Sequence, residues 1–160
     1  MSWSQVIKAV HVLIGFWFVA GLVGRGVTLA RARRTRDLGT MGELLTVAGV
    51  FDRLMVIPGS VAVLVAGLLT MWAQGRSLFA PHQWWLGVSL IVFLSSIPLV
   101  PLVFVPRGKR FEADLEEARS RGQVTPELTA AYRDGWVAFA RTYELAMVVF
   151  VIVLMVTKPF

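Results

Sequence analysis

Four long apolar stretches dominate this sequence, and they restrict its fold more than any other feature. They cover residues 5–24, 54–73, 84–105 and 135–157. The second and third contain no charged residue. The ionisable residues of the first and the fourth are Lys8, His11, Arg141 and Glu144. About 20 helical residues cross the hydrocarbon core of a bilayer, and in lipid every backbone N–H and C=O group must be paired within the segment. We therefore predict four transmembrane helices.

The charge content agrees with a membrane protein. Charged residues make up 16% of the chain, against about 25% in a typical soluble domain. The net charge of +6 would favour nucleic acid only if the basic residues formed a soluble face. They lie instead around the connections between apolar stretches, so we predict the lipid bilayer as a partner and no nucleic acid. The absence of cysteine excludes disulfides, thiolate zinc sites, iron–sulfur clusters and c-type haem.

Lysine and arginine are concentrated in two of the three connections, and this predicts the orientation. The first connection carries Arg25, Arg31, Arg33, Arg34, Arg36 and Arg53, and the third carries Arg107, Lys109, Arg110, Arg119, Arg121 and Arg133. Arg76 is the single basic residue between the second and third stretches. By the positive-inside rule both long loops are cytoplasmic in the cell membrane and both termini face outward. The tryptophans expected at the outer interface are Trp3, Trp72, Trp84 and Trp85, with Trp136 at the inner one.

The predicted fold class is all-α: a polytopic membrane protein with four transmembrane helices in one antiparallel bundle over residues 1–160. Short amphipathic cytoplasmic helices are expected between the third and fourth spans. Apolar residues recur at helical spacing in Phe111, Leu115 and Ala118, and Gly122 follows as a helix end. Thr125 and Pro126 predict the cap and first turn of a second short helix.

The ionisable residues of the first span share one face. At 100° per residue a single stripe contains Lys8, His11, Gly15, Phe18, Leu22 and Arg25. Ionisable groups cost about 2.5–3.5 kcal/mol each inside a membrane, so this stripe, which we call the interior stripe, should face other helices. Gly15 leaves space beside the imidazole of His11, either for a flat macrocycle or for another helix.

Further charged residues lie toward the cytoplasmic side of the spans. Together they predict one intramembrane charge network, made of Arg25, Asp52, Arg53, Arg141 and Glu144. Such a network serves either as a clasp between helices or as a path for protons or substrate. In the third span, a bend is expected at Ser95, Ser96, Pro98 and Pro101.

A second imidazole lies on the outer side. His82 precedes the third span, so His11 and His82 could together bind haem b. A copper site at His11 is an alternative if Met71 or Met155 joined the two histidines, because copper accepts imidazole and thioether ligands. Neither histidine lies in a motif with metal-ligand spacing. A lone interfacial histidine is otherwise a solvated residue.

Several of these residues resemble a known pattern. Lys8, Ala9 and His11, followed by Trp17, Phe18, Ala20 and Gly21, look like the first helix of HemJ-type protoporphyrinogen oxidases and of the related CopD-like membrane proteins. Arg53, Leu54, Pro58 and Gly67 are similar to the second helix of HemJ, and Arg141, Tyr143, Glu144 and the final run 153–160, ending in Lys158, Pro159 and Phe160, to its C-terminal part. The resemblance covers roughly half of the chain. It implies a four-helix membrane protein whose first-helix histidine binds haem.

The sequence departs from that pattern in the third span. HemJ-type enzymes carry a lysine there, and the matching position is Ser89. The cytoplasmic loop with Pro106, Arg107, Lys109 and Arg110 is closer to a family of small predicted integral membrane proteins, a domain of unknown function. We therefore expect a distant HemJ-like and CopD-like relative.

Three functions follow as hypotheses. The first is a haem- or porphyrin-binding redox protein, with His11 as the axial ligand and Arg53 and Glu144 tuning charge or handling protons. The second is a non-catalytic accessory or assembly subunit, because no complete catalytic constellation is present. The third is copper or small-solute transport. Ala20 and Gly24 could also support a homo-oligomer. Whether the protein is an enzyme stays open at this point.

Overall fold

The computed structural model describes residues 2–78, 80 and 82–159, and every regular element among them is a helix. The chain divides into two compact units, Met1–Pro81 and His82–Phe160. Three helical stretches are long and apolar enough to cross a membrane, namely Trp3–Ala32, Leu38–Ala73 and Pro126–Thr157. A fourth apolar helix, Trp84–Leu94, is shorter. The predicted all-helical membrane architecture is therefore confirmed at this level.

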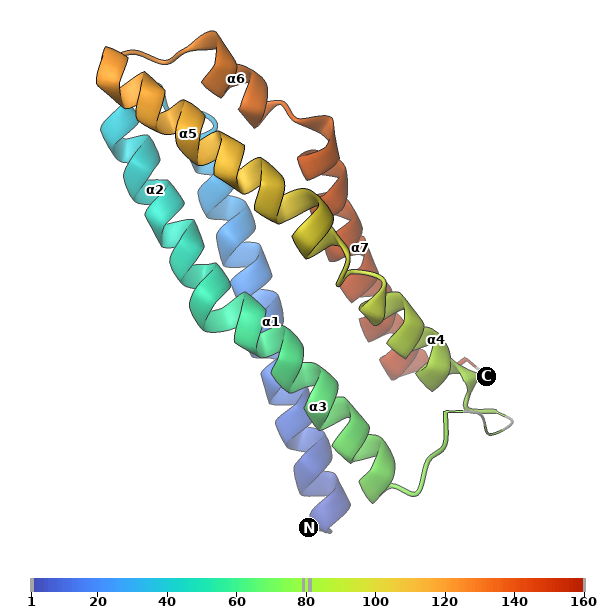
Figure 1. The fold of residues 1–160 in the computed structure, drawn as a ribbon. Coiled ribbons are helices and arrows are strands. Elements are labelled where there is room, and N and C mark those ends of the chain that lie inside the picture. The colour runs from blue at the N-terminus through green and yellow to red at the C-terminus, as the bar shows by residue number, and fades with distance from the viewer. Residues whose placement is uncertain (1, 79, 81, 160) are drawn as a thin grey trace. The chain divides into compact units, whose positions relative to one another are not determined.

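The first unit is an antiparallel helical hairpin (Figure 1). Helix α1 (Trp3–Ala32) forms one arm. The other arm runs without interruption through α2 (Leu38–Phe51), the π-helical turn η1 (Asp52–Val56) and α3 (Ile57–Ala73). The predicted long loop after the first span is thus mostly helix. Its sequence between residues 38 and 51 is apolar and contains no proline, so nothing stops the helix there.

A short turn joins the two arms, and Asp37 begins the second arm. Its carboxylate accepts a hydrogen bond of 2.7 Å from the backbone N–H of Thr40, which caps the first turn of α2. Hydrogen bonds from the side chain and the backbone of Thr40 hold the pKa of the Asp37 carboxyl below its usual value. The four exposed arginines of this end of the hairpin are Arg31, Arg33, Arg34 and Arg36.

Glycines set the distance between the two arms. A Cβ atom added at Gly21 would lie 2.5 Å from Cβ of Met55, and one added at Gly59 would lie 3.1 Å from Cβ of Phe18. Side chains there would force the helices apart, so the backbones approach closely only because these positions are glycine. Phe18 and Leu22 are buried in the contact. From His11 to Arg25 the interior stripe of α1 therefore faces the second arm, as predicted, whereas Lys8 at its start is exposed.

Two π-helical turns share one cause. η1 (Asp52–Val56) is followed by Pro58 and η2 (Val100–Phe104) by Pro106, at the same spacing. A proline nitrogen has no hydrogen to donate, so the carbonyl four residues earlier loses its α-helical partner. The chain takes i→i+5 bonds just before each proline, from Ile57 N–H to the Asp52 carbonyl in η1. The extra residue changes the phase of the helix, so side chains before and after the turn lie on different faces.

The second unit begins with an interrupted helix. Helix α4 (Trp84–Leu94) ends after 11 residues, about 16 Å, and the chain continues through η2 into α5 (Val105–Arg121). The hydroxyl of Ser95 lies 2.5 Å from the Val92 carbonyl and 2.5 Å from the hydroxyl of Tyr143. The expected bend of the third span is thus a break, because the prolines of this segment interrupt the hydrogen-bond ladder. The segment predicted as the third span, residues 84–105, thus consists of α4, the interruption after Leu94 and η2.

The short helices between the third and fourth spans are present. Gly122 ends α5 in the left-handed conformation, with φ of 66°, and Thr125 caps α6 (Pro126–Tyr132), as the sequence predicts. Helix α7 (Gly135–Thr157) follows. Asp134 caps α7 and also accepts a hydrogen bond of 2.7 Å from Nε of Arg107, which ties the start of α5 to the start of α7.

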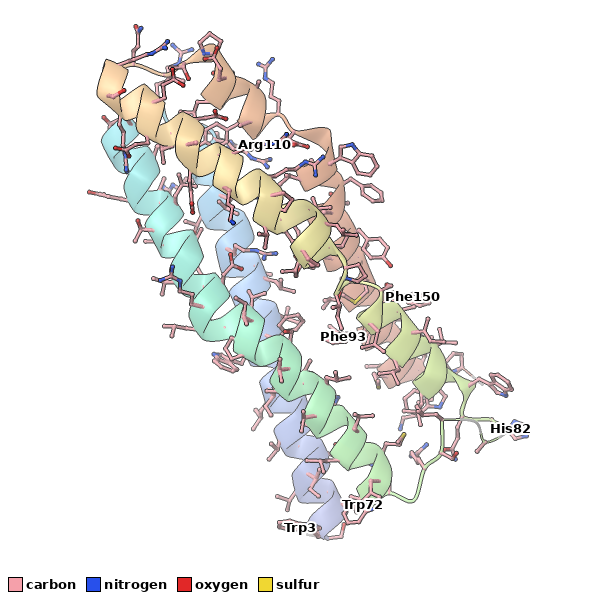
Figure 2. All side chains as sticks on the ribbon, viewed as in Figure 1. Trp3, Trp72, His82, Phe93, Arg110 and Phe150 are labelled. Carbon is pink, nitrogen blue, oxygen red and sulfur yellow. The ribbon has the colours of Figure 1, made fainter. Side chains whose placement is uncertain are left out.

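The first hairpin has chemically different ends. Figure 2 shows Trp3 and Trp72 together at the end opposite the arginine-rich turn. Helix α1 has 30 residues, about 45 Å in length, against a hydrocarbon core of about 30 Å. If the tryptophans lie at one membrane interface, the arginine-rich end extends about 15 Å beyond the other side of the core.

We predict opposite effects of alanine at two glycines of α1. Gly21→Ala should lower the free energy of unfolding by about 1–3 kcal/mol, because the new methyl group overlaps Met55. Gly26→Ala is the matched control. No atom lies within 4 Å of a Cβ at position 26. The free energy of unfolding of this variant should therefore stay the same or rise by up to about 1 kcal/mol, because alanine has the higher helix propensity. Titration of the purified proteins from mild detergent into SDS, followed by tryptophan fluorescence, measures both. Equal losses would contradict glycine-dependent packing.

Candidate functional site

His11 lies on the face of α1 that packs against α3. A Cβ atom added at Gly67 would be 3.2 Å from Cε1 of His11, 3.6 Å from Nδ1 and 3.9 Å from Nε2. The imidazole thus occupies a notch that exists because residue 67 has no side chain. The interior position predicted for His11 is the one that the structure shows, with the side chain half-buried.

One nitrogen of this imidazole has unusual surroundings. Nδ1 is buried and has no hydrogen-bond partner in the described part of the chain, although the backbone carbonyl of Val63 lies near the ring. A buried polar atom without a partner costs about 1–3 kcal/mol, so Nδ1 calls for an explanation such as a water, an ion or a functional role.

Helix α3 fills the space beside Gly15. A Cβ atom at Gly15 would lie 3.9 Å from Cγ2 of Val63, an ordinary van der Waals contact. The sequence left either a flat macrocycle or another helix for this space, and the structure contains another helix. A flat macrocycle would therefore have to reach His11 from outside the space between Gly15 and Val63.

The second histidine belongs to the other unit. His82 is exposed and has φ of 64°, a left-handed conformation in which histidine is enriched. Met71 lies on α3 and Met155 on α7, so the proposed copper ligands are also divided between the units. In residues 2–78, 80 and 82–159, no three His, Asp or Glu side chains form a group that could hold a metal ion.

Part of the predicted charge network is formed within the first unit. Nη1 of Arg25 lies 2.9 Å from Oδ1 of Asp52, with 12% of the arginine side chain exposed. Asp52 opens η1, so the π-helical turn starts at this ion pair. Arg53, the next residue, is exposed. Arg141 and Glu144 lie half-buried on α7 of the second unit.

Ser89, which stands where the resemblance expects a lysine, has a local role. It is 2% exposed, and its hydroxyl donates a hydrogen bond of 2.6 Å to the Trp85 carbonyl one turn earlier on α4. The hydroxyl is thus satisfied by its own helix. The third span contributes no buried cation at this position.

Sequence reasoning missed two polar contacts in the second unit. The hydroxyls of Ser95 and Tyr143 pair across α4 and α7, and Arg107 pairs with Asp134. Neither pair follows from helical periodicity, because each joins residues that are distant in sequence. The π-helical turns did have a sequence signal, the prolines Pro58 and Pro106 inside otherwise helical stretches.

Comparison with known families identifies the class of protein. The family described as "Predicted integral membrane protein (DUF2269)" matches residues 5–159. The chain therefore belongs to this family of predicted integral membrane proteins. No curated protein and no solved structure matches the sequence.

We predict that Arg25 and Asp52 stabilise the hairpin as a pair. A double-mutant cycle with Arg25→Gln and Asp52→Asn should give a coupling energy of about 1–2 kcal/mol, because the pair is charged and half-buried. Arg53→Gln is the control. Its side chain is exposed, so the free energy of unfolding should change by less than about 0.5 kcal/mol. SDS unfolding of the four variants measures these values, and a coupling energy of zero would contradict the pairing.

Proposed function

We propose that this protein binds haem b or a related porphyrin in the membrane, with His11 as the axial ligand. The observation that carries the proposal is the imidazole in the notch at Gly67, with Nδ1 buried and without a partner in the described residues. The resemblance of the first helix to HemJ-type proteins points to the same histidine. His82 remains a candidate for a second ligand.

The surroundings of His11 suit such a role. His11 lies eight residues after Trp3, about 12 Å along the helix, which puts it inside the hydrocarbon core near the tryptophan end. Haem bound there would supply one-electron redox chemistry. The hairpin would restrict the orientation of the imidazole, because the backbone of α3 at Gly67 lies against the ring.

A non-catalytic accessory subunit is the second candidate. Ser89 supports it, because a hydroxyl bonded to its own helix replaces the functional lysine that the resemblance leads one to expect. In this case His11 would serve only helix packing against Gly67. Copper transport is the third candidate, and it would need ligands beyond the groups that the described residues bring together.

An absorption spectrum separates these candidates. Protein expressed in haem-replete cells and purified in mild detergent should show a Soret band, and His11→Ala should lose it because the iron loses its axial ligand. His82→Ala is the companion variant. It should keep the band, with a shift from low to high spin if His82 is the sixth ligand. A missing band, or a band unchanged in His11→Ala, would favour the accessory role.

We also propose four membrane spans in the cell membrane, with both termini outside and both long connections in the cytoplasm. The distribution of lysine and arginine supports this orientation. The position of Trp3 and Trp72 at one end of the hairpin, opposite the arginine-rich turn, supports it as well (Figure 2). The interrupted third helix would cross as α4 and η2 together, continuing into α5.

The absence of cysteine makes the orientation directly measurable. Single-cysteine variants Ser2→Cys and Ser77→Cys should react with a membrane-impermeant maleimide in intact cells. Arg34→Cys and Ser120→Cys should react only after permeabilisation, because their segments carry the basic residues that stay in the cytoplasm. The reverse labelling pattern would overturn the orientation, and labelling of Ser77→Cys from the inside alone would overturn the four-span topology.

A further inference from the structure

A basic side chain lies one helical turn from His11 on the same face of α1. Lys8 and His11 are three residues apart within this helix, so their Cβ atoms are about 5–6 Å from each other. Lys8 is exposed and lies on the side of Trp3, about 4.5 Å nearer to that end of the hairpin than His11. Its ammonium group can therefore reach the membrane interface while the imidazole remains in the core.

The carboxylates of the first unit lie far from Lys8. They belong to Asp37, Glu43 and Asp52, which all lie in the turn or on the part of the second arm that precedes α3. The other cation of the interior stripe, Arg25, lies 17 residues further along α1, about 25 Å away, and is paired with Asp52. In the described residues of this unit, Lys8 is thus the basic group next to the histidine, and no acidic side chain of the hairpin neutralises it.

We propose that Lys8 binds a carboxylate of the porphyrin held at His11, so that the propionate edge of the ring points toward the tryptophan end of the hairpin. This inference rests on the proposed function. Haem b carries its two carboxylates on one edge of an otherwise apolar ring. An apolar ring in the core with its acidic edge at the interface satisfies both environments, and an ammonium–carboxylate pair is a strong charge-assisted contact. The site would then select porphyrins with free carboxylates over esterified ones.

Haemin titration tests this role directly. Apoprotein in mild detergent is titrated with haemin, and the Kd is measured from the Soret band and from quenching of tryptophan fluorescence. Lys8→Gln should weaken binding about tenfold, the effect expected from loss of one charge-assisted hydrogen bond. Lys8→Arg should retain the affinity for haemin. Arg76→Gln, which removes a cation after the end of α3, should bind haemin like the unchanged protein. The spin state should be the same in all of these variants, because His11 is intact.

Titration with haemin dimethyl ester is the second part of the experiment. It should bind the unchanged protein about tenfold more weakly than haemin, and its affinity should not respond to Lys8→Gln. If Lys8→Gln leaves haemin binding unchanged, or weakens haemin and its ester equally, Lys8 interacts only with lipid headgroups or detergent and the inference is overturned, while a band that depends on His11 still supports haem binding. If neither ligand binds in a manner that depends on His11, the proposed function itself fails.

Discussion

The close approach of α1 to η1 and α3 is the contact on which the first unit depends. Inside a bilayer no hydrophobic effect drives helices together, so packing and backbone proximity must do so. Gly21, Gly59 and Gly67 provide that proximity, each opposite a larger side chain of the facing arm. The contact also decides where polar groups can lie. Gly67 leaves room for the imidazole of His11, and the same face of α1 carries Arg25 to Asp52 further along the hairpin.

Prolines supply the second constraint. In each unit a proline removes one backbone donor, and the helix responds with a π-helical turn just before it. In the first unit this turn begins at Asp52, which pairs with Arg25. In the second unit, further prolines accompany the end of α4 after Leu94, and the Ser95 hydroxyl there bonds both the Val92 carbonyl and Tyr143. Irregular backbone at membrane depth needs such partners.

These two constraints explain why the candidate site is small. The groove between the arms is filled by helix packing, so a porphyrin would lie against the hairpin and not within it. Nδ1 of His11 is buried against the protein. Membership of a family of predicted integral membrane proteins agrees with this architecture, and the proposal of haem binding depends on the chemistry of His11.

The sequence alone determined the helical membrane class, the interior stripe of α1, and the caps at Gly122 and Thr125, because these follow from local composition and helical periodicity. It left open what fills the space beside Gly15, and it extended a loop where α2 is helical. Tertiary structure decided the notch at Gly67, the Arg25–Asp52 pair and the Ser95–Tyr143 pair. Each joins residues far apart in the chain, and periodicity gives the face of a helix but not the residue that lies opposite.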